Sequence, residues 1–274
     1  MIKAGRLCWH FQLMGNGPAL LLIHGTGAAT HSWRAMAPLL ARRFTVLAPD
    51  LPGHGFTGSK DSATQSLVGM SRALNALLKE LRFAPDIAVG HSAGAAILAR
   101  LCLNGVIEPK LLVALNGAFA PLEGLAGYLL PSMAKLLFLN PFAPRFFAWT
   151  TDRAAVSRLL RGTGSEIDEE GVDYYARLFR NPAHVAGALG MMANWDLLAL
   201  HRELPRLAAA TALIVGAKDK AVPPLAARMS AARMPNAFVE RLEGLGHLAH
   251  EEQPALVAAI ILRFAEQTGI FAAA

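Results

Sequence analysis

The chain has 274 residues, of which 54% are hydrophobic and 17% are charged. This composition excludes a disordered chain, and the lack of a glycine period or a sustained heptad excludes collagen-like and coiled-coil structures. The formal net charge is +6, but Lys and Arg are scattered without a dense run. We therefore expect surface charge with at most weak attraction to anionic lipid, and no nucleic-acid partner.

Two cysteines, Cys8 and Cys102, are too few for a disulfide scaffold, and no Cys/His cluster has zinc-ligand spacing. We expect both to be buried free thiols, and we expect no metal and no cofactor. The N-terminus lacks the apolar core of a signal peptide, and charged residues and prolines interrupt every long apolar stretch. These features predict a cytoplasmic protein with at most peripheral membrane contact.

Short apolar runs alternate with helix-like stretches, which predicts an α/β protein with a mostly parallel, doubly wound sheet. The predicted strands are Leu7–Met14, Ala19–Ile23, Thr45–Pro49, Asp86–Gly90, Leu111–Asn116, Ala212–Val215 and Phe238–Leu242. The first is expected at an outer edge because it is less uniformly apolar, and the others are expected to be covered on both faces. The predicted helices between them are Trp33–Arg43, Ser66–Leu81, Ala93–Asn104, Pro224–Ala232 and Pro254–Glu266.

The alternation stops between about Phe119 and Leu204. That stretch predicts only helices, at Tyr128–Leu139, Arg153–Leu160, Gly171–Arg180 and Ala183–Leu200. We therefore expect a core made of residues 1–118 and 205–274, with residues 119–204 inserted as a helical lid. The lid has more large apolar residues than one helical layer needs, so they either pack the lid onto the core or line a pocket for an apolar ligand. They are Leu129, Leu130, Met133, Leu136, Leu137, Phe138, Phe142, Phe146, Phe147 and Trp149.

The most informative motif is Gly90-His91-Ser92-Ala93-Gly94, directly after a predicted strand and directly before a predicted helix. A sharp strand-to-helix turn with Ser at its apex projects the hydroxyl above the strand ends and points a helix N-terminus at it. The alternative is a plain turn in which Ser92 caps the helix.

A second glycine-rich turn, His24-Gly25-Thr26-Gly27, follows the strand Ala19–Ile23. In an acyl-transfer site, backbone N–H groups at Thr26 and Ala93 would hold the oxyanion. The rival is a dinucleotide fingerprint over residues 25–30 with Asp50 as the ribose acid, but Thr30 breaks its last position. A phosphate-binding loop over residues 53–60 fails as well, because the string ends Gly-Ser-Lys.

Two polar residues follow the last two strands: Asp219 after Ala212–Val215, and His247 after Phe238–Leu242. The order Ser92, Asp219, His247 matches the Ser…Asp…His order of one hydrolase architecture, in which the histidine takes the serine proton and the acid orients the imidazole. Asn116 cannot serve as the acid. The other candidates read as structural: His24, His54, His91 and His250 as buried hydrogen-bonding groups, and Asp50 as a loop-organising acid.

Together, the strings HGTG, DLPGHGFTGS, GHSAG, GAKDKAVP and GHLAHEEQP resemble the markers of the α/β-hydrolase superfamily. The resemblance implies that fold, with Ser92 as nucleophile, Asp219 as acid, His247 as base, and Thr26 and Ala93 as oxyanion donors. More narrowly, HGTGAATHSWRAMAPLLA, GHSAGAAI, KLLFLNPFAPR and HVAGALGMMANWDL are similar to the magnesium-chelatase accessory proteins of bacteriochlorophyll biosynthesis. This implies a role around magnesium insertion into protoporphyrin or elsewhere in pigment synthesis, with magnesium-chelatase subunits as partners and at most a peripheral position at the photosynthetic membrane.

We expect serine-dependent ester hydrolysis through an acyl-enzyme on Ser92, with a small apolar or tetrapyrrole-like ester as substrate. Two alternatives stay open, because a triad alone does not separate them: a non-catalytic porphyrin-binding accessory protein on a hydrolase scaffold, and a cofactor-free perhydrolase. Arg145, Arg153 and Arg158 either meet the carboxylates of such a macrocycle or simply face solvent.

Overall fold

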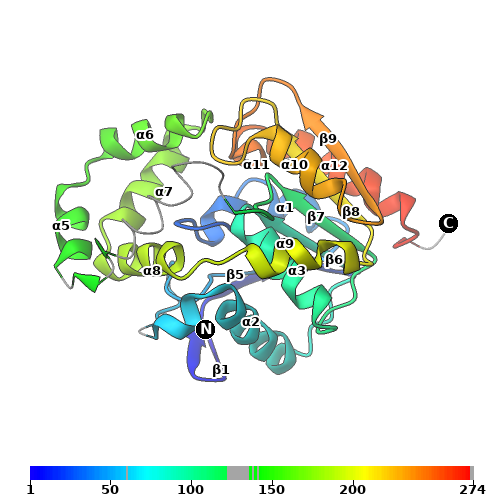
Figure 1. Cartoon of the computed structure of the whole chain (residues 1–274), viewed down its shortest axis with the longest axis horizontal. Helices are drawn as coiled ribbons and strands as arrows, with labels where there is room; N and C mark the ends of the chain where they lie inside the picture. The colour runs from blue at the N-terminus through cyan, green and yellow to red at the C-terminus, as the bar shows by residue number, and fades with distance from the viewer. Residues whose placement is uncertain (60, 122–135, 138, 141, 272–274) are drawn as a thin grey trace.

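The computed structural model describes residues 1–59, 61–121, 136–137, 139–140 and 142–271. Its centre is a seven-stranded sheet in the order β3-β5-β4-β6-β7-β8-β9 (Figure 1). The strands are β3 (Phe11–Met14), β4 (Ala19–Ile23), β5 (Thr45–Pro49), β6 (Ile87–His91), β7 (Leu111–Leu115), β8 (Thr211–Gly216) and β9 (Ala237–Leu242). Every pairing is parallel except that of β3 with β5. This confirms the predicted sheet, with its first strand at one edge.

Two apolar clusters cover the two faces of the sheet. Side chains alternate along a strand, so Leu21 and Ile23 of β4 join one cluster while Leu20 and Leu22 join the other. A strand buried on both sides has no position for a polar side chain, which explains its unbroken apolar run. The flanking helices are α1 (Ala37–Leu40), α2 (Leu67–Leu81), α3 (Ala93–Leu103), α10 (Pro224–Ala231), α11 (Ala249–Glu252) and α12 (Pro254–Gln267), with 3-10 turns η1 (Thr30–Trp33) and η2 (Ser62–Gln65).

The N-terminal prediction is wrong in one respect, because the expected strand Leu7–Met14 is interrupted at His10. Its first half is β2 (Leu7–Trp9), which pairs with a strand that was not predicted, β1 (Ile2–Ala4), in a separate two-stranded sheet. At the break, His10 hydrogen-bonds Asp50 through its ring and Thr57 through its backbone N–H. The thiol of Cys8 on β2 is exposed, contrary to expectation, whereas Cys102 is half-buried.

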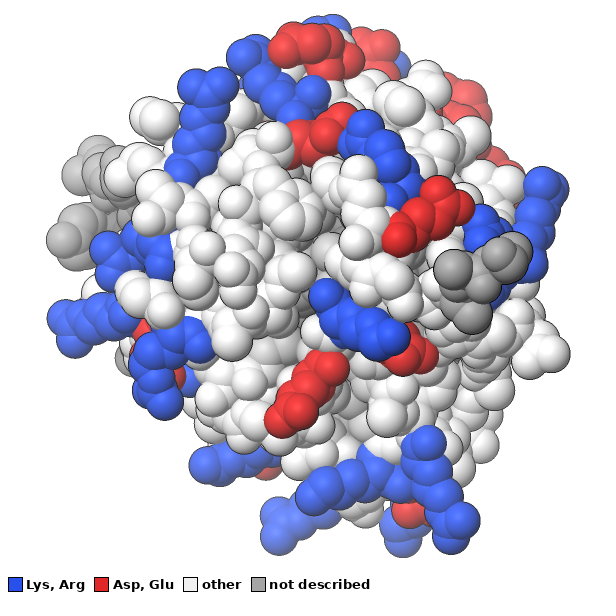
Figure 2. Space-filling model, turned by 90° about the vertical axis from the view of Figure 1, so that its right-hand side faces the viewer, with Lys and Arg blue, Asp and Glu red and all other residues white. Residues whose placement is uncertain are grey.

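The expected helix Trp33–Arg43 is also wrong, since only η1 and the short α1 form there. Pro38 explains the break, because a proline inside a helix removes a hydrogen bond and clashes with the preceding turn. At the opposite edge of the sheet, Phe238 and Val239 of β9 are exposed rather than covered. Figure 2 shows the face beside this edge, where basic and acidic side chains are spread among uncharged ones rather than gathered in one patch.

Between β7 and β8, the described residues form helices without a strand. They are α5 (Ala143–Thr150), α6 (Arg153–Gly162), α7 (Glu169–Phe179), α8 (Pro182–Ala193) and α9 (Leu198–Glu203), followed by η3 (Leu204–Arg206). We call residues 143–203 the α5–α9 segment. The helices α5 to α8 lie together at one end of the molecule, on the left of Figure 1. The boundaries 119 and 204 of a lid remain a prediction.

Three details of this segment differ from the sequence prediction. Most of the expected helix Tyr128–Leu139 lies outside the described residues, and α5 was not predicted. The expected helix Ala183–Leu200 is two helices, because α8 ends before Asn194 and the Asp196 side chain accepts the Leu198 N–H at the start of α9. The predicted helices at α6 and α7 are confirmed, and Asp152 and Asp168 cap their N-termini.

Most of the described apolar residues that were assigned to lid packing or to a pocket do neither. These side chains are exposed: Leu136, Phe142, Phe146, Phe147 and Trp149. Leu137 alone is partly buried, while Leu129, Leu130, Met133 and Phe138 lie outside the described residues.

Candidate active site

Ser92 occupies a strained turn between β6 and α3. Its backbone has φ 51° and ψ −116°, a conformation that costs a non-glycine residue about 1–3 kcal/mol. Three hydrogen bonds hold it there: Ser92 N–H donates to Leu115 O at 2.9 Å, and Ser92 O accepts from Ala95 N at 3.2 Å and Ala118 N at 3.1 Å. The surrounding sheet and helix therefore fix the position of the serine hydroxyl.

The glycines of the motif are required by close packing. A Cβ on Gly90 would lie 2.4 Å from Ala95 N, and a Cβ on Gly94 would lie 2.2 Å from Ile23 O. A Cβ on Gly25 would lie 3.1 Å from Ser92 Cβ. The His24–Gly27 turn therefore abuts the serine. A larger residue at Gly25 or Gly94 would push the two loops apart, and one at Gly90 would distort the serine turn itself.

Asp219 and His247 meet at the carboxyl edge of the sheet, on the loops after β8 and β9. The Nδ1 atom of His247 lies 2.8 Å from Oδ2 of Asp219, and both residues are buried. The other carboxylate oxygen, Oδ1, accepts the backbone N–H groups of Ala221 and Val222, each at 2.8 Å. These donors hold the Asp219 carboxylate in one orientation, and its Oδ2 is placed to accept an N–H from Nδ1 of His247.

Asn116 is a site residue that the sequence analysis set aside. Its amide donates to Oδ2 of Asp219 at 2.7 Å and to Gly246 O at 3.3 Å, from a backbone with φ 48°. The side chain therefore joins the ends of β7 and β8 to the His247 loop. A polar residue ending a buried strand was the available signal, but only its role as the acid was considered.

His247 lies beside the serine turn through His91, the residue before Ser92. The two imidazole ring centroids are 4.7 Å apart, and Nε2 of His91 donates to the backbone carbonyl of His247 at 3.0 Å. Among the described residues, the Ser92 hydroxyl makes no hydrogen bond. Catalytic contacts are often loose in a free site and tighten with substrate.

The backbone N–H groups of Thr26 and Ala93 donate to no described residue. Ala93 is the first residue of α3, where an N–H has no partner within the helix and the helix dipole favours negative charge. The Thr26 hydroxyl donates to Sδ of Met191, a residue of α8, at 3.3 Å. The backbone N–H groups of Thr26 and Ala93, which have no partner among the described residues, thus lie on either side of Ser92. The helix α8 contacts Thr26.

The helix α8 docks on the site loops through His184 and Gly187. His184 Nε2 donates to Gly27 O at 3.1 Å, and its Nδ1 accepts the N–H of Gly55 at the same distance. One imidazole therefore connects the two glycine-rich loops. A Cβ on Gly187 would lie 1.9 Å from Gly53 O, so the helix and loop backbones are in direct contact.

The histidines expected to be structural are buried and hydrogen-bonded, as is Asp50. Asp50 accepts from the backbone N–H groups of Thr30 and Phe56 and contacts His10. Burial lowers the pKa of each buried imidazole outside the Asp219 pair. The pKa falls to about 3 for His31 and His250, to about 4 for His184, and below its usual value for His24, His54 and His91.

A third buried acid, Glu251, links α7 to the core. Its Oε1 accepts the Ser32 hydroxyl at 2.6 Å and the Tyr175 hydroxyl at 2.7 Å. Burial is the main cause that raises the pKa of Glu251 to about 7, and the two hydrogen bonds and Arg34 act against it. The Ser32 hydroxyl also lies 2.8 Å from His250 Nε2. The sequence alone does not predict this network, because a Glu in the polar first turn of a helix does not differ in pattern from an exposed one.

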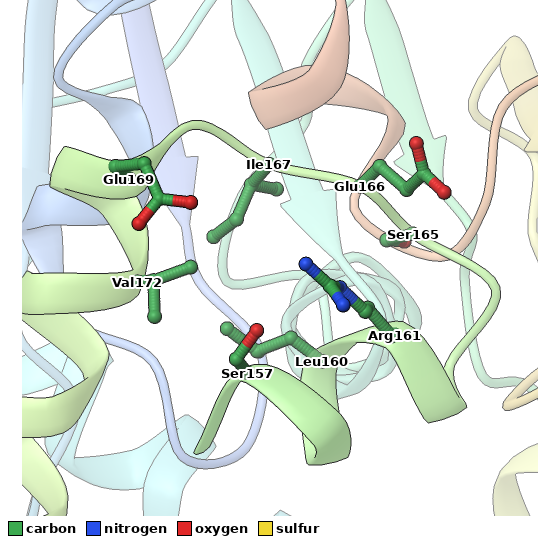
Figure 3. A pocket seen from close by; sticks show the side chains of 8 residues that line it. All are labelled: Ser157, Leu160, Arg161, Ser165, Glu166, Ile167, Glu169 and Val172. Carbon is green, nitrogen blue, oxygen red and sulfur yellow. The ribbon is translucent and has the colours of Figure 1, made fainter. Parts of the chain in front are cut away.

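A surface cleft of about 350 Å³ lies between α6 and α7 (Figure 3). Its lining residues are Ser157, Leu160, Arg161, Ser165, Glu166, Ile167, Glu169 and Val172. Ser165 accepts the N–H of Leu248, so the cleft adjoins the loop of His247, but Ser92 is not part of its lining. Among the arginines considered for a macrocycle, Arg153 pairs with Glu169 and Asp173 instead.

Within the described ranges, no three His, Cys, Asp or Glu side chains are arranged to hold a metal ion. The same part of the chain contains no helix with the length and hydrophobicity needed to cross a bilayer.

A family model described as "Alpha/beta hydrolase family" matches residues 20–260, and the chain belongs to this family. Within it, the chain is similar to the magnesium-chelatase 30 kDa subunit of Rhodobacter capsulatus, with 42% identity over 237 residues, which are 86% of this chain and 82% of that subunit. Solved structures share the fold at lower identity. A thermophilic esterase from Thermogutta terrifontis has a TM-score of 0.76 and 21% identity, covering 95% of this chain and 93% of the esterase. A laboratory-evolved potato epoxide hydrolase has a TM-score of 0.79 and 24% identity, covering 97% and 98%.

Proposed function

We propose that the protein is a serine hydrolase that cleaves an ester through an acyl-enzyme on Ser92. The observation that carries the proposal is the His247–Asp219 hydrogen bond of 2.8 Å beside a serine held in a strained strand-to-helix turn. A buried acid–imidazole pair next to a half-buried serine has no evident packing role. The strain on Ser92 is maintained by the surrounding structure, as at other functional turns.

The proposed mechanism follows from the proton positions. Because Asp219 fixes the proton of His247 on Nδ1, Nε2 is free to take the proton of Ser92 as its oxygen attacks the ester carbonyl. The N–H groups of Thr26 and Ala93 would bind the oxyanion, and each such donor is worth about 10²–10³ in rate. His247 then returns the proton to the leaving alcohol, and water releases the acyl group by the same steps.

The substrate class and the pathway are further parts of the proposal. The Rhodobacter capsulatus relative is named as a magnesium-chelatase subunit. By this similarity, we propose that the ester is apolar and tetrapyrrole-like, and that the protein acts in bacteriochlorophyll synthesis together with magnesium chelatase. We also propose a cytoplasmic location with peripheral contact at the photosynthetic membrane, which the exposed aromatic side chains of α5 support.

Fluorophosphonate labelling, followed by intact mass and peptide mapping, tests the catalytic part. Such a probe reacts with a serine that a base and an oxyanion hole activate. A single adduct on Ser92 that is lost in His247→Ala is expected. No adduct on the folded protein, or an adduct that persists in His247→Ala, would rule the mechanism out.

A second candidate is a non-catalytic accessory protein that binds a porphyrin or a chelatase subunit. Two observations favour it: the relative carries the name of a subunit, and the Ser92 hydroxyl lacks a hydrogen bond to any described residue. This candidate predicts porphyrin binding that persists in Ser92→Ala, together with an absence of ester turnover in the unmodified protein.

A further inference from the structure

The helix α5 presents an apolar face to solvent. Phe142, Phe146 and Trp149 are 70%, 59% and 84% exposed, and their spacing of four and three residues places them on one side of a helix. Arg145 lies on the same side, one turn from Phe142 and Trp149, and is also exposed. We call these four residues the α5 face.

The opposite side of the helix accounts for its docking. Ala143 and Ala148 are buried, and Ala148 packs against Val185 and Leu189 of α8. Small residues therefore attach α5 to the rest of the molecule, while its largest side chains point away. Packing against the described residues does not explain the α5 face, and α5 lies at one extreme of the molecule (Figure 1).

The chemistry of the α5 face suits a lipid surface. Aromatic side chains prefer the boundary between headgroups and acyl chains, and a nearby cation gains from anionic headgroups. Arg145 has no ion-pair partner among the described residues, and residues 136–151 contain no acidic residue. The net charge of +6 favours the same surface.

A second copy of the chain fits this face less well. A symmetric pairing would place Arg145 against its own copy, and a helix of eight residues falls short of the roughly 800 Å² per partner of a standard interface. A bilayer meets both requirements of the face, because it offers acyl chains to the rings and phosphates to the guanidinium.

We propose that the α5 face is a docking surface for an anionic lipid bilayer, with Phe142, Phe146 and Trp149 entering the interface and Arg145 binding headgroup phosphates. This rests on the proposed peripheral location and not on the proposed catalysis. The docked protein would hold α8, and with it the glycine-rich loops beside the serine turn, close to the layer in which an apolar ester dissolves.

Flotation of the full chain with vesicles tests the proposal. We compare phosphatidylcholine alone with the same lipid containing about one third phosphatidylglycerol, at low salt. Binding to the anionic vesicles is expected, with a blue shift of tryptophan fluorescence that is lost in Trp149→Ser, because Trp9 and Trp33 are fully buried and Trp195 is partly buried against the core. The triple variant Phe142→Ser, Phe146→Ser, Trp149→Ser should bind at least about tenfold more weakly.

The matched control is Leu225→Ser with Met229→Ser on α10, which removes exposed apolar side chains (66% and 50% exposed) elsewhere on the surface. It should bind like the unmodified protein. Arg145→Gln should bind anionic vesicles about fivefold more weakly and should not change binding to phosphatidylcholine alone.

Equal binding of the triple variant and the control, or no binding of the unmodified chain, would overturn the proposal. A dimer in sedimentation velocity that the triple variant abolishes would make a second copy the occupant instead. Fluorophosphonate labelling of each variant reports separately on the catalytic proposal.

Discussion

Two neighbouring helices of the α5–α9 segment, α8 and α5, differ in which side chains they bury and which they expose. On α8, His184, Gly187 and Met191 are buried against the glycine-rich loops around Ser92. On α5, Phe146 and Trp149 face solvent. A histidine and a glycine are inside, while a phenylalanine and a tryptophan are outside.

The difference shows that backbone fit, rather than hydrophobicity, decides which helix covers the site. The contact of α8 with the loops needs a residue without a side chain at Gly187 and a two-sided hydrogen-bonding group at His184. Once α8 is seated, α5 can attach through alanines and leave its large apolar side chains for another surface. This contrast between α8 and α5 can be tested by mutation and by pH.

The largest effect is expected at the serine turn, beside the loops that α8 contacts. Ser92→Ala should lower ester turnover by about 10⁴–10⁶-fold, because the nucleophile is lost while the fold is kept. Phe146→Ser on α5 should leave turnover on a water-soluble ester unchanged. Steady-state kinetics with an unchanged circular dichroism spectrum checks both, and unchanged turnover in Ser92→Ala would contradict the acyl-enzyme.

We expect acidic pH to lower the free energy of unfolding. Six imidazoles, those of His24, His31, His54, His91, His184 and His250, have a pKa below the usual 6.5 when folded, so the unfolded chain binds more protons below that pH. Stability is therefore full above pH 6.5 and falls by up to about 1.4 kcal/mol per histidine per pH unit below it.

Glu251 works in the other direction. Its folded pKa of about 7 exceeds its usual value, so its contribution falls as the pH rises toward 7, and one such group offsets only part of the histidine effect. Urea unfolding at pH 7.5 and 5.5 should therefore show a loss of several kcal/mol at the lower pH. Equal midpoints would mean that the buried imidazoles are hydrated.

A smaller change should separate α8 from the loops. In Gly187→Ala, the new methyl would meet Gly53 O, so we expect a loss of about 1–3 kcal/mol despite the better helix propensity of alanine. Gly162→Ala on α6 is the matched control, because nothing lies within 4 Å of its added Cβ. Thermal unfolding of the pair measures the difference, and equal stabilities would show that α8 can shift at no cost.

The smallest effect is expected on α5. Trp149 is 84% exposed, so Trp149→Ser should change the free energy of unfolding by less than about 0.5 kcal/mol. A loss above about 1 kcal/mol in chemical denaturation would indicate that the indole packs within the protein, and would remove the contrast with α8.

Local patterns predicted the sheet well, because β4, β5 and β7 are apolar on both faces and end at turn residues. The Gly90–Gly94 motif also predicted the turn at Ser92, since few sequences can form so tight a turn. The break at His10 and the division between α8 and α9 were not, because each depends on one side-chain hydrogen bond that competes with the backbone.

The sequence by itself determined the fold class, the serine turn and the order of the candidate triad, because short stretches of chain are enough to specify backbone geometry and strand burial. The tertiary structure alone decided that Asn116 supports Asp219, that His184 joins two loops, and that the α5 aromatics face outward. Such facts depend on which surfaces meet across long sequence separations. The free energy that selects those contacts is a property of the packed molecule and not of any segment in it.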